Sequence, residues 1–250
     1  SEMCIRDRLG LVCLLPLLNI VAISFSSSAA VEGNMVGLIP VGFSTAAYEK
    51  ILEDSQFWHS FLISVERVVL TLIINFVLIV LMAYPLSKTN AQFRGRNIYA
   101  NLMIFAMLFN GGMIPTFLLV KSYGLLNTVW ALVLPGAVPI FNVILVMNFF
   151  AAVPKELEEA AFIDGANPLQ VLTKIFIPIS KPVLATVSLF SIVGSWNDFY
   201  SGLIYMSKAA YYPLMTYIQS LQINVEDLIK QGNLSAVVDS ASPVSYTHLR

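Results

Sequence analysis

The sequence has 250 residues, of which 57% are hydrophobic and 12% are charged, and its mean hydropathy is +0.77. Soluble domains carry about 25% charged residues, so this composition excludes an ordinary soluble protein and indicates a membrane protein. The net charge of −1 indicates no particular partner, because the position of charges matters more than their sum in a membrane protein. The two cysteines and two histidines form no spacing typical of a disulfide framework or a metal site.

Charged residues are absent from four long blocks, at residues 9–31, 68–87, 97–120 and 122–154. A helix needs about 20 apolar residues to cross the hydrocarbon core, and each block is long enough. A fifth apolar stretch is interrupted only by Asp198. We therefore expect an all-α, polytopic membrane helix bundle with five spans, at about residues 9–25, 60–84, 98–120, 128–150 and 183–205.

The first span follows Arg6 and Arg8, a pattern that is also typical of a cleaved signal peptide. The length of the apolar stretch, with Pro16 and Asn19 inside it, favours a retained helix instead.

The loop at residues 87–96 orients the chain, because it carries Lys88, Arg94 and Arg96 and no acid. Positive charge in short loops marks the cytoplasmic side of a membrane. The acidic loop at residues 31–58 therefore faces outward, and we expect the amino terminus and the segment after residue 151 in the cytoplasm. Glycine and proline inside the third and fourth spans predict broken or kinked helices.

The segment at residues 154–182 is a charged island between apolar spans. Pro154 suits the first position of a helix, and Gly165 is placed to end that helix in a left-handed conformation. Asn167 and Pro168 then read as the cap and first position of a second helix at residues 169–176. Alone, this pattern fits either a docking element or an ordinary loop between spans.

The spacing within this segment resembles a known family. Glu159-Ala160-Ala161, three residues, Gly165, nine residues, and Ile175-Phe176-Ile177-Pro178 match the EAA signature of binding-protein-dependent ABC importer permeases. Ile177 departs from the signature, which usually has leucine there. Shorter matches suggest the carbohydrate branch, similar to LplC-type permeases and the smaller subunit of maltose permeases, at residues 83–88, 110–112, 127–130, 163–166, 180–182 and 196–197.

The resemblance covers about residues 9–221 and implies a subunit of an ATP-driven sugar importer in a bacterial cell membrane. Its partners would be a second permease subunit, two ATP-binding subunits, an extracytoplasmic solute-binding protein, a sugar and the lipid bilayer, with no nucleic acid. No catalytic residue, cofactor or metal is expected in this subunit. The coupling helix would contact an ATP-binding subunit through Glu159, Ala160, Ala161, Asp164, Gly165 and Pro178.

Polar residues within the spans are candidates for a sugar path, because amides and carboxylates bind hydroxyl groups and aromatic rings cover apolar sugar faces. The candidates are Asn110, Asn142, Trp196, Asn197 and Asp198. Hydrogen bonding between helices is the alternative role. Glu66 and Arg67 are adjacent on a helix and point apart, so we do not expect them to pair. We expect Arg67 to snorkel to the outer interface, with a buried functional role as the alternative.

The two ends, residues 1–8 and 239–250, do not continue the family pattern and resemble translated adapter sequence. Because permeases of this branch have six spans, we expect a permease domain at residues 9–238 with non-native ends and the last span missing. A true five-span protein is the alternative.

Three other function classes remain open. An ion-coupled secondary transporter would need more carboxylates inside its spans, and a membrane enzyme would need histidine clusters or paired catalytic acids. A structural or signalling membrane component would not co-purify with an ATPase.

Overall fold

The computed structural model describes residues 2–27, 30–31, 33–109 and 111–230, and all regular secondary structure in these residues is helical. Two compact parts are present, one made of Ser1–His59 with Tyr217–Arg250 and the other of Ser60–Thr216. The expected non-native end at residues 239–250 lies outside the described residues, as does Asn110.

The first part contains α1 (Glu2–Ser24), α3 (Ala46–Glu53) and most of α14 (Leu214–Lys230). Helix α1 covers almost all of the first expected span, at residues 9–25. Its Asn19 side chain donates a hydrogen bond of 2.6 Å to the carbonyl of Gly37. Asp54 follows α3 and accepts a hydrogen bond of 2.6 Å from the hydroxyl of Tyr217 on α14. No span was predicted where α14 lies.

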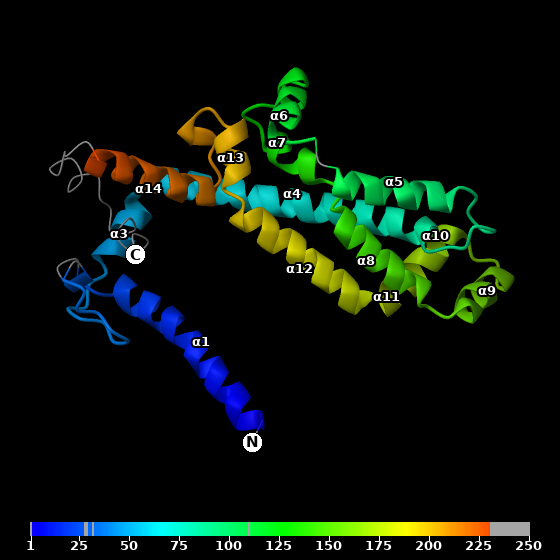
Figure 1. The fold of residues 1–250 in the computed structure, drawn as a ribbon, viewed down its shortest axis with the longest axis horizontal. Helices are drawn as coiled ribbons and strands as arrows, with labels where there is room; N and C mark the ends of the chain where they lie inside the picture. The colour runs from blue at the N-terminus through cyan, green and yellow to red at the C-terminus, as the bar shows by residue number, and fades with distance from the viewer. Residues whose placement is uncertain (1, 28–29, 32, 110, 231–250) are drawn as a thin grey trace. The chain divides into compact units, whose positions relative to one another are not determined.

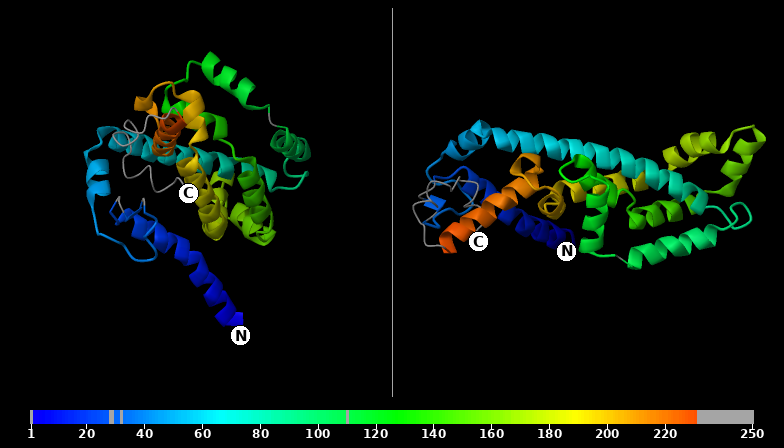
Figure 2. Two further views of the ribbon diagram at one scale, coloured as in Figure 1. Left: turned by 60° about the vertical axis from the view of Figure 1, so that its left-hand side comes forward. Right: turned by 90° about the horizontal axis from the view of Figure 1, so that it is seen from above.

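The second part is organised along α4 (Ser55–Leu86), a 32-residue helix that runs without a break (Figures 1 and 2). It extends at both ends beyond the span predicted at residues 60–84. Its buried face changes character along the helix. The buried residues in the first half are mostly polar, whereas those near its end are apolar: Ser60, Ser64, Arg67, Thr71 and Asn75, then Ile79, Val80, Ala83 and Leu86.

Shorter helices make up the rest of this part. Helix α4 alone among the described helices is long and apolar enough to cross a membrane, and up to four spans result if each bent helix pair is one span. The third span corresponds to α5 (Arg96–Leu108) and α6 (Met113–Ser122). The fourth comprises α7 (Val129–Val133), the turn η1 (Leu134–Gly136) and α8 (Ile140–Ala151), with a bend of 48°. The prediction of a broken fourth span is confirmed.

The fifth predicted span is also broken, which the sequence analysis did not anticipate. Helix α12 (Lys181–Asn197) ends before Asp198, and a short helix α13 (Tyr200–Tyr205) follows. At its other end, α12 meets the helical run Pro168–Ile179 at an angle of 84°.

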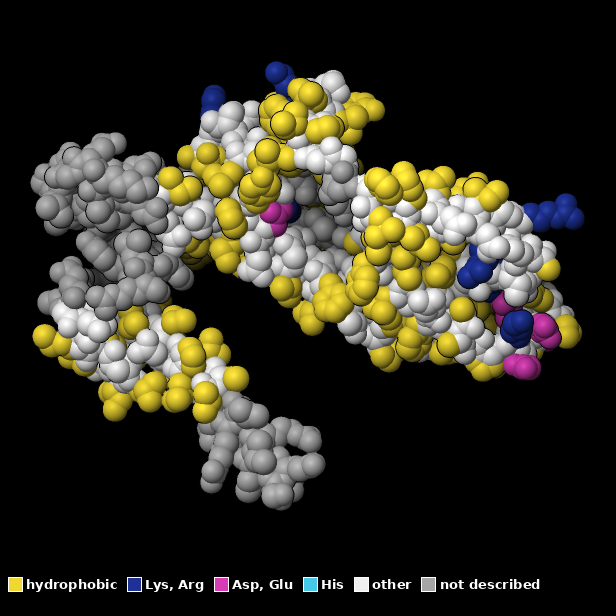
Figure 3. All heavy atoms as spheres, viewed as in Figure 1, with side chains coloured by type: hydrophobic (Ala, Val, Ile, Leu, Met, Phe, Trp, Pro, Cys, Tyr) yellow, Lys and Arg dark blue, Asp and Glu magenta, His cyan; other side chains and the backbone are white. Residues whose placement is uncertain are grey.

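An apolar core joins α4, α8, α12 and the helical run before α12. It is built from buried side chains that include Ala83, Val143, Val146, Phe150, Val171, Phe176 and Val187. The Phe176 ring lies edge-on to the rings of Tyr84 and Phe150, with centroids 5.2 and 5.4 Å away. Large exposed apolar side chains cover α5, whereas charged side chains gather at the end of this part where α9 (Lys155–Ile163) lies (Figure 3).

Candidate functional site

The charged segment forms two short helices, as expected. Helix α9 begins at Lys155, with Pro154 as its N-cap. The prediction placed Pro154 at the first helical position, one residue too far in. Its ψ of 131° is extended, which is typical of a cap and does not occur inside a helix. Glu156 and Glu158 lie in the first turn, where the helix dipole favours negative charge.

Gly165 ends α9 in the left-handed conformation, with a φ of +81°, which confirms the prediction. Two hydrogen bonds close the turn: the N–H of Ala166 donates to the carbonyl of Ala161 at 2.9 Å, and that of Gly165 to Phe162 at 3.0 Å. This pair of bonds is the Schellman motif. A Cβ at Gly165 would meet nothing within 4 Å, so the backbone conformation and not crowding favours glycine.

The second helix, α10 (Pro168–Val171), has Asn167 as its N-cap and Pro168 at its first position, which confirms the prediction, and the cap is a capping box. The Asn167 side chain accepts from the Gln170 N–H at 2.8 Å, and the Gln170 side chain accepts from the Asn167 N–H at 2.9 Å. The run then widens into a π-helical turn, η2 (Leu172–Phe176), before α11 (Ile177–Ile179). Pro178 has no N–H and would clash with the carbonyl four residues earlier in a regular α-helix, so a local widening there relieves the conflict.

The residues of the EAA match lie mostly on the surface. Ala161 is half-buried, whereas Glu159, Ala160, Asp164, Gly165 and Pro178 are exposed. Apolar side chains accompany them, and Ile163 is 85% exposed. A hollow of about 500 Å³ separates α9 from the following helices and is lined by Ala161, Asp164, Gly165, Ala166, Gln170, Val171, Lys174 and Ile175.

A buried ion pair attaches α9 to the end of α4. The Nζ of Lys88 lies 2.7 Å from Oε1 of Glu158, and both side chains are nearly buried. The same Nζ lies 4.1 Å from the ring centroid of Tyr84 and 4.2 Å from that of Phe176. Sequence reasoning missed this contact. No sequence signal links Glu158 to Lys88.

A second feature is a chamber of about 250 Å³ inside the same part, here called the polar chamber. Helices α4, α8, α12 and α13 and the α7–η1 turn surround it. Its lining combines charged, amide and hydroxyl side chains with small and apolar residues: Arg67, Thr71, Asn75, Ala131, Leu132, Val133, Pro135, Gly136, Pro139, Asn142, Phe190, Ser191, Gly194, Ser195, Asp198, Ser201 and Tyr205.

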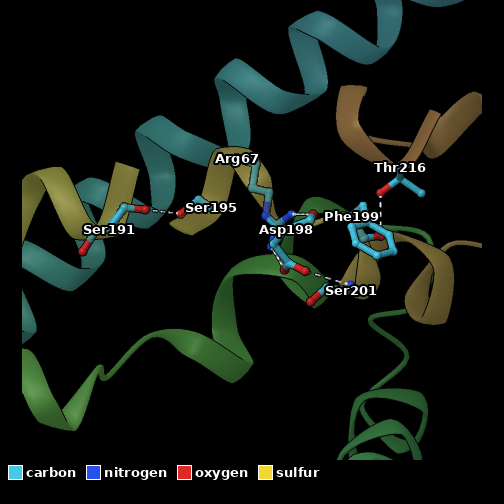
Figure 4. A network of polar contacts seen from close by, with 7 residues as sticks. All are labelled: Arg67, Ser191, Ser195, Asp198, Phe199, Ser201 and Thr216. Atoms are coloured by element: carbon cyan, nitrogen blue, oxygen red, sulfur yellow. Dashed lines mark hydrogen bonds and ion pairs between the residues drawn. The ribbon is translucent and has the colours of Figure 1, made fainter. Parts of the chain in front are cut away.

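Arg67 forms an ion pair with Asp198 in this chamber (Figure 4), so the prediction that Arg67 snorkels to an interface was wrong. Its side chain is only 4% exposed. One guanidinium nitrogen binds the Asp198 carboxylate and another donates to the Asp198 backbone carbonyl at 2.9 Å. That carbonyl lies at the break between α12 and α13, where it has lost its helical partner. The expectation that Arg67 and Glu66 do not pair is confirmed, and Glu66 is exposed.

Asp198 also caps the helix that follows it. Its other carboxylate oxygen accepts from the N–H of Ser201 at 3.1 Å. The next carbonyl, that of Phe199, accepts a hydrogen bond of 2.9 Å from the hydroxyl of Thr216 (Figure 4). Side chains from other segments therefore bind both backbone carbonyls at this break, and the carbonyl of Phe199 also accepts from the N–H of Leu203 at 3.2 Å.

The remaining path candidates are placed differently. Asn142 is 6% exposed and lines the polar chamber together with Asp198. Trp196 packs edge-on against Phe61, with centroids 6.0 Å apart, and does not line the chamber. Asn197 is exposed and donates to the carbonyl of Val193 in its own helix at 3.0 Å. The prediction that these residues contact a sugar stays a prediction.

Comparison with known proteins gives the family. Residues 75–238 match the family model described as "Binding-protein-dependent transport system inner membrane component". LplC of Bacillus subtilis (strain 168) is 42% identical over 214 residues, which are 86% of this chain and 72% of LplC. The polygalacturonan/rhamnogalacturonan transport system permease protein YtcP of the same organism is 39% identical over 238 residues, covering 95% of this chain and 82% of YtcP.

A solved structure has the same fold. It is described as a bacterial ABC transporter involved in the import of the acidic polysaccharide alginate, and one of its chains superposes with a TM-score of 0.84 at 33% identity. The match covers 98% of this chain and 87% of that one. The protein is therefore a helical membrane protein of the binding-protein-dependent transport system inner membrane component family, the permease subunits of bacterial ABC importers.

Proposed function

We propose that the protein is the permease subunit of an ATP-driven importer of sugars, specifically oligosaccharides or polysaccharide fragments. It would pair with a second permease subunit, two ATP-binding subunits that hydrolyse the ATP, and an extracytoplasmic solute-binding protein. The printed functions of the relatives support this cargo class, because YtcP and the solved neighbour are named for polysaccharide transport. In this proposal the amino terminus is cytoplasmic and residues 9–238 form the permease domain.

We assign residues 154–182 as the segment that docks an ATP-binding subunit. The observation that carries this assignment is the exposed face of α9, where small residues stand beside unpaired carboxylates. Among the residues that the structure describes, neither Glu159 nor Asp164 has an ion-pair partner. Both can bind Arg or Lys of a partner, and Ala160, Ala161 and Gly165 allow close approach of its backbone. Pro178 would complete the segment by shaping the run that leads into α12.

The proposed sugar path uses the residues named from the sequence. Asn142 and Asp198 would contact sugar within the polar chamber, and Asn110, Trp196 and Asn197 would contribute from other surfaces of the path. Support for the first two is their position, because both line a polar cavity inside an otherwise apolar membrane protein.

The docking assignment is tested by Gly165→Leu in the transporter reconstituted with all its subunits. A β-carbon in a left-handed position costs about 1–2 kcal/mol locally and places a bulky group on the docking face. We expect co-purification of the ATP-binding subunit and sugar uptake to fall at least tenfold.

Gly124→Leu is the matched control. Gly124 has a φ of +68° and, like Gly165, open space around its missing Cβ, but it lies between α6 and α7. The control variant carries the same backbone strain away from α9 and should keep uptake. If Gly165→Leu retained both assembly and uptake, the docking assignment would be wrong.

A further inference from the structure

Three buried polar side chains form a row along one face of α4. Arg67, Thr71 and Asn75 are spaced four residues apart and are 4%, 8% and 4% exposed. Four residues advance an α-helix by about 6 Å, so the row is about 12 Å long. All three residues line the polar chamber.

Each member of the row has an atom without a protein partner. The atoms are the Nε of Arg67, the Oγ1 of Thr71 and the Oδ1 of Asn75. They are three of the four buried side-chain N and O atoms that lack a partner in the described part of the chain; the fourth, in Ser180, is not in the chamber lining. More than about 90% of buried polar groups in proteins are paired, and an unpaired one costs about 1–3 kcal/mol. All three atoms belong to residues that line one cavity, so a polar group bound there could supply the partners they lack.

The three atoms fit a ligand with hydroxyl groups. The Arg67 N–H donates, the Asn75 oxygen accepts and the Thr71 hydroxyl can do both, which matches hydroxyl groups that both donate and accept. An anion does not fit, because Asp198 already neutralises Arg67 and the Asn75 oxygen would repel it. A metal cation does not fit beside a guanidinium group.

The size of the chamber and its remaining lining residues further restrict the class of ligand that can bind. Pockets for drug-sized ligands span about 300–1,000 Å³, so a chamber of about 250 Å³ has room for about one ring of an oligosaccharide, and its open side leaves space for the rest of the chain. Pro135, Pro139 and Phe190 add apolar surface to the lining, against which the C–H face of a ring can pack.

We propose that Arg67, Thr71 and Asn75 form a row of hydrogen-bonding groups that binds the hydroxyls of one uncharged sugar ring, or the uncharged part of an acidic one, during transport. The proposal rests on the sugar-transport function and deepens it. This subunit contacts its cargo through α4, which the sequence analysis did not include among the path candidates.

The test uses the complete transporter in proteoliposomes, with uptake of labelled three- to six-sugar oligosaccharides from polygalacturonan, rhamnogalacturonan and alginate. Thr71→Val and Asn75→Leu each remove a hydrogen-bonding group while keeping a similar volume. We expect each to raise the KM of uptake roughly three- to tenfold, which corresponds to the loss of about one hydrogen bond. Thr186→Val is the control, because Thr186 is exposed on α12 outside the chamber.

Thermal unfolding of the same variants distinguishes a chamber that binds sugar from one that holds only structural water. If the chamber holds only water, both variants leave the KM unchanged, and removal of the unpaired Thr71 hydroxyl leaves the unfolding temperature equal or higher. Asn75→Leu also loses the hydrogen bond of 3.3 Å that the Asn75 amide nitrogen donates to the Ser191 hydroxyl, so that variant is judged by its KM. That result would contradict the proposed sugar-binding role of this row and would leave the proposed transport function intact. If the parent transporter takes up none of these sugars, the proposed function and the row fail together. A raised KM in both variants with the control unchanged supports the row.

Discussion

The two buried ion pairs of the larger part contrast in what surrounds them. Arg67 and Asp198 meet at a cavity lined with polar groups, and the guanidinium keeps one N–H without a protein partner. In the second pair, the Nζ of Lys88 binds Glu158 and lies over the rings of Tyr84 and Phe176. The first pair is exposed to whatever fills the chamber, whereas the second is closed by protein.

The choice of cation follows from these surroundings. The planar guanidinium of Arg67 binds a carboxylate and a backbone carbonyl at once, which the point charge of a lysine does less well. The ammonium of Lys88 is compact enough to lie about 4 Å from two ring centroids, where the ring faces partly replace lost water. One pair therefore holds a helix break beside a cavity, and the other fixes α9 against the end of α4.

The largest expected effect comes from removing the cation of the open pair. Arg67→Met leaves the Asp198 carboxylate without its partner and one carbonyl of the α12–α13 break unpaired. Breaking a fully buried pair on one side costs about 3–5 kcal/mol, and the 29% exposure of the Asp198 side chain lowers this cost. The carbonyl that also loses its partner adds about 1–3 kcal/mol, so we expect a loss of about 3 kcal/mol, measured as a drop in the unfolding temperature of purified protein in detergent.

A double variant and a control test whether the lost charge pairing is the cause. Arg67→Met combined with Asp198→Asn should recover part of the loss, because the unpaired charge is then gone. Lys121→Met, at an exposed cation on α6, should have almost no effect. An Arg67→Met protein as stable as the parent would contradict the buried pair.

The closed pair should give a smaller loss of stability and a larger loss of coupling. Lys88→Met strands Glu158, but both side chains keep about a tenth of their surface exposed, so water reduces the cost to about 2 kcal/mol. Because the pair fixes α9, we expect uptake per ATP hydrolysed to fall more than the ATPase rate.

Comparing uptake with ATPase activity in the same proteoliposomes measures that ratio. Lys121→Met, which removes an exposed cation on α6 outside the docking segment, is the control and should leave the ratio unchanged. A Lys88→Met transporter with a normal ratio would show that the pair has no part in coupling.

The smallest effect is expected at the uncharged contact beside the open pair. Thr216→Val removes the hydroxyl that binds the Phe199 carbonyl and keeps the side-chain volume against Gly202, where an added Cβ would lie 2.0 Å from the Thr216 oxygen. We expect a loss of about 1 kcal/mol, seen as a small decrease in unfolding temperature, with Thr186→Val unchanged. A loss as large as that of Arg67→Met would mean that charge contributes little at this break.

Local rules explain what could be predicted from the sequence. Pro154, Gly165, Asn167 and Pro168 act through their own backbone and near neighbours, so both ends of α9 and the start of α10 were predictable to within a residue. Charge-free blocks likewise located the apolar helices. The π-helical turn that ends α10 at Val171 was not predicted. The break at Asp198 was not predicted, because an aspartate inside an apolar run does not reveal whether the helix continues.

The contacts that sequence reasoning missed join distant parts of the chain. The partner of Arg67 lies 131 residues away, so the sequence around Arg67 did not reveal the ion pair, and Arg67 was expected at an interface. Lys88 and Glu158 are likewise 70 residues apart. A polar residue every fourth position on α4 was visible in the sequence. Its significance needed the position of α12 and α13, which supply the facing wall of the chamber.

The unbroken length of α4 has a consequence for how the two ion pairs move relative to each other. Arg67 lies within this helix and Lys88 follows two residues after its end, about 30 Å away along the axis. A regular helix neither stretches nor shortens at low cost, so the two ion pairs keep a fixed spacing and a fixed angular phase. Inserting one residue between them would rotate one pair by about 100° relative to the other. Loops elsewhere tolerate insertions, but an insertion or deletion within this helix would separate the two ion pairs from their partners.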